Sequence, residues 1–363
     1  MLSAGNGFIM QSEKYSRDNA GQSLKKYILL KKGELAYNHG ASKAKQYGCC
    51  YELTEDEARI PYVYHCFKVS GAEHTPYVAT ALNNPKIDRQ LKRLVSSSVR
   101  MDGLLNISFD DYMSVILHLP SLKEQTHIAD FLKKLDERIT AQEKLVASLK
   151  KHKRGLLNAF FAEKSDYFLF SDASALKIEE VCDVLSGKRI PKGETFCSHP
   201  TEYRYITVSD MGEKYVCSDN LQYISEHTEK QISRYKVKGG DIIISVAGTL
   251  GKLNIITSDL GGVNLTENCD RFTNFRGVGS EYLYYVLSSD LIQSQIESSK
   301  TKNGQPKLAL ERIRNFTIPV PHQEIQEQLV KVMISLDQFI ASQLAILDRY
   351  CKLRSGLLQQ LFI

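Results

Sequence analysis

Apolar residues recur at alternating spacings of four and three along two stretches of this chain, 128–160 and 329–361. This spacing is typical of the a/d seam of a coiled coil, in which one apolar stripe of a helix packs against a partner helix. At ~1.5 Å of rise per residue, each stretch predicts a helix roughly 60 Å long. The predicted seam residues are Ile128, Leu132, Leu135, Ile139, Gln142, Val146, Leu149 and Leu156 in the first helix, and Leu329, Met333, Leu336, Ile340, Gln343, Leu347, Tyr350 and Leu357 in the second.

The two stretches are copies of one sequence unit. Residues 120–161 align without a gap with residues 321–362, at an offset of 201 (321 − 120). Polar seam positions match as well as apolar ones, which two unrelated amphipathic core helices would not explain. An ungapped internal repeat therefore indicates one structural unit used twice. The identical pairs include Pro120/Pro321, Gln125/Gln326, Asp136/Asp337, Gly155/Gly356 and Phe161/Phe362.

The rest of the chain mixes short apolar strands, helical stretches and polar turns before each long helix. In the first block we expect a strand, turn and strand over 27–37, a helix over 76–95 and an exit strand over 115–119. We predict an α+β fold, with two mixed α/β domains separated by two long antiparallel helices that form a coiled coil with a pseudo-twofold repeat. The predicted boundaries are 1–119 and 164–319 for the two domains, and 120–163 and 320–363 for the two helices.

The second block is longer than the first. Gly33-Glu34 matches Gly240-Asp241, at an offset of 207 (240 − 33). At that offset, the first block lacks a counterpart of residues 178–207. The first domain is therefore either a compact variant, or the chain begins inside the domain.

Composition narrows the class of protein. The chain has 363 residues, 42% of them hydrophobic, which predicts a globular protein with two or three domains. The eight cysteines form no C-x-x-C pair, and we expect a reduced cytoplasmic protein without a metal site. No stretch approaches ~20 apolar residues, so we expect no membrane span. The net charge of +5 does not by itself indicate a nucleic-acid binder, so any positive surface must be local.

No catalytic constellation emerges from the sequence. The stretch Gly248-Thr-Leu-Gly-Lys252 is the nearest approach to a phosphate loop, but Leu253 stands where Ser or Thr must meet Mg²⁺. We therefore expect a turn between two strands, with its glycines at positive φ. The Pro-Pro-aromatic motif of a base methyltransferase is also missing, and no metalloprotease-type His motif occurs. This lack of catalytic motifs favours a binding or scaffolding role.

The repeated helix carries a family resemblance. The motif at 120–125, followed by Leu135-Asp136 and 155–157, and its second copy resemble the repeated regions of the specificity subunit of type I restriction-modification enzymes. The segments 240–252 and 303–308, and the run 318–321, look like parts of that family's target-recognition domains. The resemblance covers nearly the whole chain from about Ile28. The abbreviated first domain departs from the family's pattern.

The resemblance implies a non-catalytic subunit that binds double-stranded DNA. Each of two target-recognition domains would read one part of a bipartite sequence, and the helices would act as spacers that dock methyltransferase subunits. Motor and nuclease subunits would join the complex. S-adenosylmethionine, ATP and Mg²⁺ would belong to those partners, with no cofactor or metal in this chain. Two alternatives stay open: a related system with a fused methyltransferase-nuclease partner, and a coiled-coil scaffold that binds no DNA.

Turn residues with amide, imidazole or cationic side chains are the natural readers of base edges and phosphates. In the run 150–154, four cations and a His would contact phosphate or a partner, or else form a solvated helix face. For docking a partner we nominate Gly155, Leu156, Gly356 and Leu357, and we predict that Gln142 and Gln343 face each other in the seam. The DNA-binding candidates are Asn38, His39, Lys43, Lys45 and Arg100 in the first domain, and Lys188, Arg189, Lys192, Thr249, Lys252, Lys302, Asn303, Gln305 and Lys307 in the second.

Overall fold

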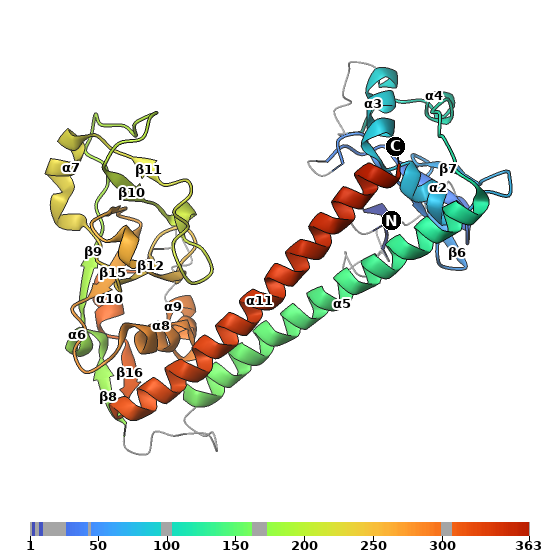
Figure 1. Ribbon diagram of the computed structural model, residues 1–363. Coiled ribbons are helices and arrows are strands. Elements are labelled where there is room, and N and C mark those ends of the chain that lie inside the picture. The colour runs from blue at the N-terminus through green and yellow to red at the C-terminus, as the bar shows by residue number, and fades with distance from the viewer. Residues whose placement is uncertain are drawn as a thin grey trace. The chain divides into compact units, whose positions relative to one another are not determined.

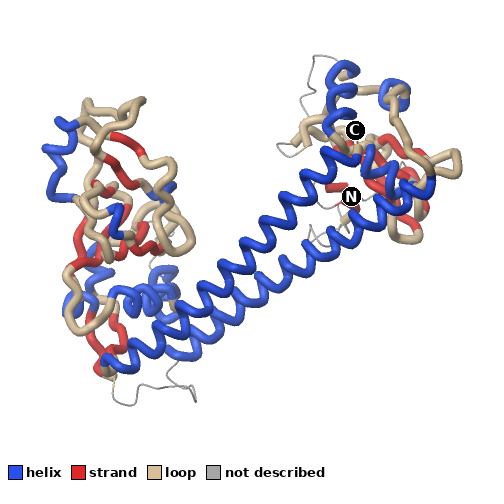
Figure 2. The backbone as a smooth tube through the Cα atoms, in the orientation of Figure 1, coloured by secondary structure: helices blue, strands red, loops and turns tan. Residues whose placement is uncertain are grey.

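The computed structural model describes residues 2–3, 7–9, 27–42, 45–95, 104–161, 173–298 and 307–362. The chain divides into two compact units: unit 1 comprises Met1–Lys144 and Leu344–Ile363, and unit 2 comprises Leu145–Gln343. Both predicted long helices form, as α5 (Leu122–Phe161) and α11 (Gln323–Leu361), and Figures 1 and 2 show them without a break. Each long helix contributes one of its ends to each unit.

Unit 1 is built on a three-stranded antiparallel sheet in the order β5-β4-β7. A two-stranded ladder of β3 with β6 and a short β1–β2 pair accompany it. Its core includes Leu35, Tyr37 and Leu91, all at most 1% exposed. The elements are β1 (Leu2–Ser3), β2 (Gly7–Phe8), β3 (Ile28–Lys31), β4 (Leu35–Asn38), β5 (Cys49–Glu52), β6 (Glu57–Ile60), β7 (His65–Phe67), α2 (Thr75–Ala81), α3 (Pro85–Leu94) and α4 (Phe109–Met113).

Unit 2 is larger and has three sheets. They run in the orders β13-β12-β15-β9, β11-β10-β14 and β16-β8. The strands are β8 (Ser174–Lys177), β9 (Asp183–Ser186), β10 (Arg204–Ile206), β11 (Gln222–Tyr223), β12 (Ile242–Ser245), β13 (Leu253–Ile255), β14 (Asn264–Leu265), β15 (Cys269–Thr273) and β16 (Thr317–Val320). The helices are α6 (Ile178–Val181), α7 (Glu226–Ile232), α8 (Ser280–Ser288), α9 (Asp290–Ser298) and α10 (Leu310–Arg314), with 3₁₀ turns η2 (Val208–Asp210), η3 (Ser233–Tyr235) and η4 (Ser258–Leu260).

The two units share one plan. The order β5-β4-β7 in unit 1 matches β13-β12-β15 in unit 2, and α2, α3 and α4 match α8, α9 and α10. The turn before the central strand is the same in both: Gly33 and Gly240 have φ of +82° and +86°. The following carboxylate, of Glu34 or Asp241, accepts a backbone N–H bond at 2.8 Å in each unit.

The stretch 76–95 is two helices and not the single one predicted. Asn84 stops the first and caps the second, because its side-chain oxygen accepts bonds from the N–H groups of Lys86 at 2.7 Å and Ile87 at 3.2 Å. Pro85 follows at the first helical position, where proline is tolerated.

Within each unit the ends of α5 and α11 pack antiparallel. In unit 1, Asp136 of α5 bonds Arg354 of α11, with a second contact at 3.1 Å. In unit 2, Lys153 of α5 forms an ion pair with Asp337 of α11. These are the same two positions of the repeat, since 337 − 136 and 354 − 153 both equal 201. The predicted α+β fold with antiparallel helices is confirmed.

All sixteen seam residues are buried or half-buried. Gln142 is buried at 6% exposure and Gln343 is half-buried. Their bond across the seam stays a prediction.

The expected exit strand over 115–119 is wrong for unit 1. Residues 317–320, its repeat counterpart, pair with β8 as strand β16. Residues 115–119 have no strand partner among the described residues. The described part of unit 1 also holds no counterpart of β8, α6 and β9, in agreement with the shorter first block.

By length and composition alone, α11 passes the test for a membrane span, with a mean hydropathy of 1.4 over its most apolar window. The expectation of no sufficiently apolar stretch was therefore wrong. A core helix passes the same test, and α11 buries Leu329, Met333 and the polar Gln326 within unit 2. Only 17% of that window is buried within the described structure.

Candidate nucleic-acid interface

The basic and polar candidates of unit 2 gather at one edge of its four-stranded sheet. In this antiparallel sheet, β9 and β12 end at the same edge at which β15 and β13 begin. The loop 187–192 follows β9, and the turn 246–252 joins β12 to β13. Sequence segments that lie far apart thus present their side chains together.

The loop after β9 is held close to the strand β14. Gly187 is needed there, because a Cβ would come within 2.0 Å of the carbonyl oxygen of Thr266. The N–H of Lys188 donates to the carbonyl of Leu265 at 2.8 Å. Its ammonium lies 5.8 Å from the ring centroid of Tyr235, and its side chain is exposed.

Arg189 and Lys192 project from the same loop and are both exposed. The guanidinium of Arg189 donates to Glu267 at 2.5 Å, and this bond raises the pKa of Arg189 above its ordinary value. Partial burial alone would raise the pKa of the Glu267 carboxyl, but the bond from Arg189 lowers it overall. Glu267 therefore orients one cation of this edge.

The stretch 246–252 is a turn between antiparallel strands, as predicted. Gly248 and Gly251 have φ of +73° and +80°. The hydroxyl of Ser245 donates to the carbonyl of Thr249 at 2.5 Å and accepts from the N–H of Lys252 at 2.9 Å. The side chain of Thr249 is exposed at the tip.

A third segment joins this edge beside the turn. Lys307 forms an antiparallel bridge with Ala247, and the N–H of Leu308 donates to the carbonyl of Val246 at 2.9 Å. Lys307 is exposed. Lys302, Asn303 and Gln305 lie outside the described residues.

One DNA-binding candidate of unit 2, Lys252, already has a partner within the unit. The ammonium of Lys252 bonds the backbone carbonyl of Met211, and the side chain is half-buried. Lys252 thus holds the turn to the segment at 211, and we remove it from the predicted DNA contacts.

The equivalent edge of unit 1 has the same construction. Gly40 bridges Leu104, and the N–H of Leu105 donates to the carbonyl of His39 at 2.8 Å, as the turn and the segment after it do in unit 2. The Asn38 amide oxygen accepts from the N–H of Gly40 at 2.9 Å. The Lys45 ammonium donates to the carbonyl of Asn83 at 3.3 Å.

His39 is buried, unlike the exposed candidates for reading bases. It is 5% exposed and its Nδ1 lies 2.9 Å from the carbonyl oxygen of Leu105. At the offset of 207 it matches Val246, a core residue that is 2% exposed, which is the sequence signal that would have excluded it. Lys43 and Arg100 lie outside the described residues.

A basic face in unit 1 was missed by the sequence reasoning. The helix α3 exposes Lys86, Arg89, Lys92 and Arg93, while Ile87 and Leu91 face the core. The spacing of three and four along one helix would have shown this face. The counterpart helix in unit 2, α9, has Leu291, Ser294, Glu297 and Ser298 at these positions and carries no such charge.

The run 150–154 is largely bound within unit 2. Lys150 pairs with Glu213 at 2.6 Å, Lys153 with Asp337, and Arg154 with Asp290 at 2.8 Å. Only Lys151 and His152 remain as exposed members for which we find no internal role. Most cations of residues 150–154 therefore hold α5 to unit 2 and are not free to contact phosphate.

Asp337 is the centre of a half-buried polar cluster. It accepts bonds from Tyr285 at 2.6 Å and from Lys214 at 3.3 Å, besides its pair with Lys153. Lys214 also pairs with Glu281 at 2.9 Å, and its side chain is 13% exposed. Burial favours the neutral acid, yet the bonds from Lys153 and Tyr285 lower the pKa of Asp337 overall. Asp337 is therefore a charged anchor of α11.

The repeated glycines face open space within the chain. A Cβ at Gly155 or Gly356 would meet no atom within 4 Å. Packing within the chain therefore does not require glycine at either position. Leu156 and Leu357, beside them, are half-buried.

Comparison with known proteins shows which proteins this chain is similar to. Residues 171–349 match the model of the type I restriction modification DNA specificity domain. The type I restriction enzyme MjaVIII specificity subunit of Methanocaldococcus jannaschii is 23% identical over 261 residues, covering 68% of this chain and 61% of that protein. The EcoBI specificity subunit of Escherichia coli is 23% identical over 305 residues, covering 78% and 60%. The chain thus spans about three fifths of the length of these relatives.

Solved structures show the same fold. A chain from a structure described as the basis of complex assembly and conformational transition of the type I R-M system has a TM-score of 0.61 at 18% identity, covering 92% of this chain and 82% of that one. The type I restriction-modification S subunit from M. genitalium has a TM-score of 0.55 at 18% identity, covering 93% and 85%.

Proposed function

We propose that this chain, which belongs to the family of type I restriction-modification specificity subunits, recognises a bipartite DNA sequence and positions methyltransferase subunits on it. The observation that carries this proposal is the edge of the sheet in unit 2. There three distant segments present Lys188, Arg189, Lys192, Thr249 and Lys307 together. Cations position a protein on phosphates, and polar side chains on turns reach base edges.

Unit 1 would bind DNA by different residues. Its edge candidates Asn38 and Lys45 bond their own backbone surroundings, whereas α3 exposes four cations on one face. We therefore assign the phosphate contacts of unit 1 to Lys86, Arg89, Lys92 and Arg93. Phosphate contacts carry no sequence information themselves, so this face would orient the unit on the duplex.

Catalysis would reside in other subunits. Among the described residues, no group of three His, Cys, Asp or Glu side chains is placed to hold a metal ion. The chemistry supplied by S-adenosylmethionine, ATP and Mg²⁺ would come from methyltransferase, motor and nuclease partners. The chain itself would act without a cofactor.

The glycines of the repeat support a docking role for the long helices. Glycine in a helix interior costs about 1 kcal/mol relative to alanine, and no contact inside this chain requires it. A partner backbone that approaches closely would require it. We assign methyltransferase docking to the surface that includes Gly155 with Leu156, and Gly356 with Leu357.

A salt-dependent DNA-binding assay tests the recognition role. The triple variant Lys188→Ala, Arg189→Ala and Lys192→Ala should bind random duplex DNA more weakly, with the slope of log K against log salt reduced by about 2 to 3. The control removes three exposed cations from other elements of the same unit: Lys177→Ala on β8, Arg312→Ala on α10 and Lys331→Ala on α11.

Equal effects of the two triple variants would show that net charge, and not this edge, binds DNA. If the parent chain showed no salt-dependent affinity for duplex DNA, the scaffold reading would replace the proposed function.

A further inference from the structure

We infer that unit 1 carries a docking surface for a strand–helix–strand segment of another polypeptide, of the kind that residues 173–186 provide inside unit 2. This inference goes beyond DNA recognition and rests on the internal repeat. Three separate surfaces of unit 1 correspond to surfaces that this segment covers in unit 2. Each is formed by described residues and is left uncovered by them.

In unit 2 the segment makes three kinds of contact. Its strand β8 pairs with β16, its helix α6 contacts α10, and its strand β9 pairs with β15. Ile178 and Val181 of α6 are at most 1% exposed, and the N–H of Ile178 donates to the carbonyl of Phe316 at 2.9 Å. The segment is thus an integral part of the core of unit 2.

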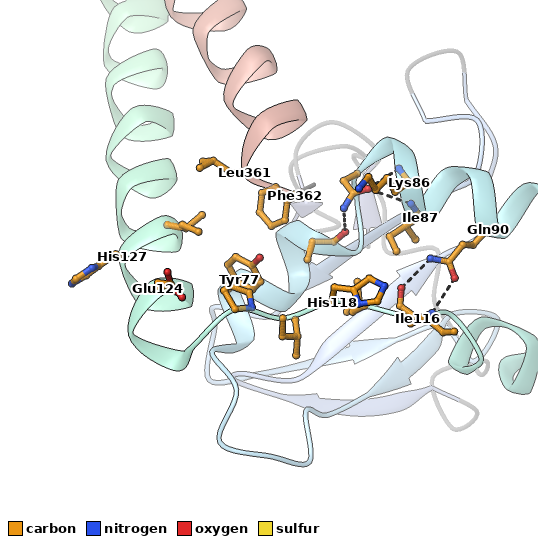
Figure 3. A pocket seen from close by; sticks show the side chains of 16 residues that line it. Tyr77, Lys86, Ile87, Gln90, Ile116, His118, Glu124, His127, Leu361 and Phe362 are labelled. Carbon is orange, nitrogen blue, oxygen red and sulfur yellow. Dashed lines mark hydrogen bonds between the residues drawn. The ribbon is translucent and has the colours of Figure 1, made fainter.

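The first uncovered surface is the stretch 116–119, the counterpart of β16. One edge of it is tied to α3, because the amide of Gln90 donates to the carbonyl of Ile116 at 2.9 Å and accepts from its N–H at 3.0 Å (Figure 3). The backbone groups of Leu117 and Leu119 find no hydrogen-bond partner among the described residues. Their counterparts, Ile318 and Val320, sit in the ladder with β8.

Apolar side chains on this stretch are also exposed. Ile116 is 64% and Leu119 38% accessible. A further strand can add to an extended segment that has free main-chain groups. The hydrogen bonds then give affinity, and exposed apolar side chains such as these give specificity.

The second uncovered surface is α4, the counterpart of α10. Phe109 and Met113 are 43% and 48% exposed. At the position of Met113, α10 has Arg314, which donates to the carbonyl of Val184 in β9 at 3.1 Å. The same helix face is therefore occupied in unit 2 and apolar but open in unit 1.

The third uncovered surface is the outer edge of β7. This strand pairs with β4 and lies at the end of its sheet, whereas its counterpart β15 pairs with β9 on that side. Phe67 corresponds to Phe272, which lies opposite Val184. An unpaired strand edge is a template for a further strand.

A cavity lies where the three surfaces meet. It has a volume of about 210 Å³ and is lined by residues of all three, among them Phe67, Tyr112, Val115 and Leu117. Val115 is the repeat counterpart of Phe316, the residue that α6 bonds in unit 2. A helix turn with two apolar side chains, like Ile178 and Val181, fits this position.

The occupant is thereby specified. It is an extended strand, a single helical turn and a second strand, with apolar residues spaced as Leu176, Ile178, Val181 and Val184 are in this chain.

A binding measurement on the full chain without DNA tests the inference. The probe is a fluorescently labelled synthetic peptide of residues 173–187, used under reducing conditions. We expect saturable binding of one peptide per chain. Two changes in the peptide, Leu176→Asp and Ile178→Asp, should weaken it at least tenfold.

Two variants of the full chain locate the peptide. Leu119→Pro removes an N–H group that has no partner in the described structure, and should weaken peptide binding at least tenfold. The control Leu353→Ala truncates a leucine of unit 1 that is 50% exposed and lies on α11, and should leave binding unchanged. No saturable binding, or equal binding by the Leu119→Pro chain, would overturn the inference while leaving the proposed DNA recognition untouched.

Discussion

Units 1 and 2 attach their globular parts to the long helices in the same way. In unit 1 the Gln125 amide donates to the carbonyl of Pro120 at 2.9 Å and accepts from the N–H of His74 at 3.0 Å. In unit 2 Gln326 bonds Pro321 at 3.0 Å and the N–H of Gly279 at 3.4 Å. His74 and Gly279 are the N-cap residues of α2 and α8.

The far ends of the helices also repeat. Phe362, directly after α11, packs on Tyr77 of α2, with ring centroids 5.1 Å apart (Figure 3). Phe161 of α5 packs on Tyr282 of α8 at 6.2 Å. Each globular part is thus fastened to the beginning of one long helix and the end of the other. Each globular part is therefore attached at two points to the ends of the long helices in its own unit.

The units differ in how the repeated Asp is held. Asp136 and Arg354 are partly exposed, with side-chain accessibilities of 46% and 38%. Asp337 is 22% accessible and is surrounded by Lys153, Lys214 and Tyr285. The same sequence position therefore makes a more exposed ion pair in one unit and a half-buried network in the other. The contribution of a repeated residue to stability depends on its neighbours, and unit 2 has additional elements that provide such neighbours.

The largest difference in stability between the two units should appear when the carboxylates of Asp136 and Asp337 are removed. Asp337→Ala leaves Lys153 and Lys214 without their shared partner, and losing hydrogen bonds to a half-buried charged group costs about 1.5–3 kcal/mol. Asp136→Ala should cost at most about 1 kcal/mol, as expected for an exposed pair. Hydrogen exchange of peptides from each unit measures both effects. Equal losses would show that the two pairs are equivalent.

Replacing Gln125 or Gln326, which attach the globular parts to the long helices, should lower the free energy of unfolding by the same amount. Gln125→Leu and Gln326→Leu each leave a buried proline carbonyl and an N-cap N–H unpaired, which costs about 1–3 kcal/mol per site. Unfolding by urea, followed by circular dichroism, gives the free energies. A loss in only one variant would break the equivalence of the two joints.

Acid should weaken unit 2 through Asp337. Its pKa is lowered in the folded state, so its stabilising contribution is present above the unfolded value of about 3.9 and is lost as the pH falls through the folded value. Hydrogen exchange of α11 peptides between pH 6 and pH 3 reports this loss. The Asp337→Asn variant should not show this acid-induced loss of protection in α11. If its exchange changed with pH as in the parent chain, the loss would belong to other groups.

The smallest effect on folding is expected at the repeated glycines. Gly155→Ala and Gly356→Ala should raise stability by up to about 1 kcal/mol each, because alanine favours helix and open space surrounds both positions. The same variants should weaken association with a methyltransferase subunit, measured by titration calorimetry. Undiminished association would remove these glycines from the docking surface.

The sequence predicted the long helices and their seam, because a seam of period 3.5 and an ungapped repeat leave few alternatives, whereas their antiparallel pairing was implied by the family resemblance. It did not predict the bonds Asp136–Arg354 and Asp337–Lys153. Those partners belong to different copies of the repeat, and they become neighbours only once the helices run antiparallel.

The candidate interface was predictable by segment and not by residue. The turn around Thr249 and the loop around Arg189 were found because glycines and cations mark surface turns. The burial of His39 and the backbone carbonyl partner of Lys252 could not be predicted, because both depend on tertiary contacts. The basic face of α3 was missed because 76–95 was predicted to be a single helix.

Mapping of methylated sites tests modular recognition most directly. Residues 164–319 are exchanged for the equivalent block of a relative with a different target, and the assembled methyltransferase complex modifies genomic DNA. Modification is then read at base resolution. The account predicts that one half of the bipartite site changes, while the other half and the spacer between them stay the same. A simultaneous change of both halves, or no change in either, would contradict it.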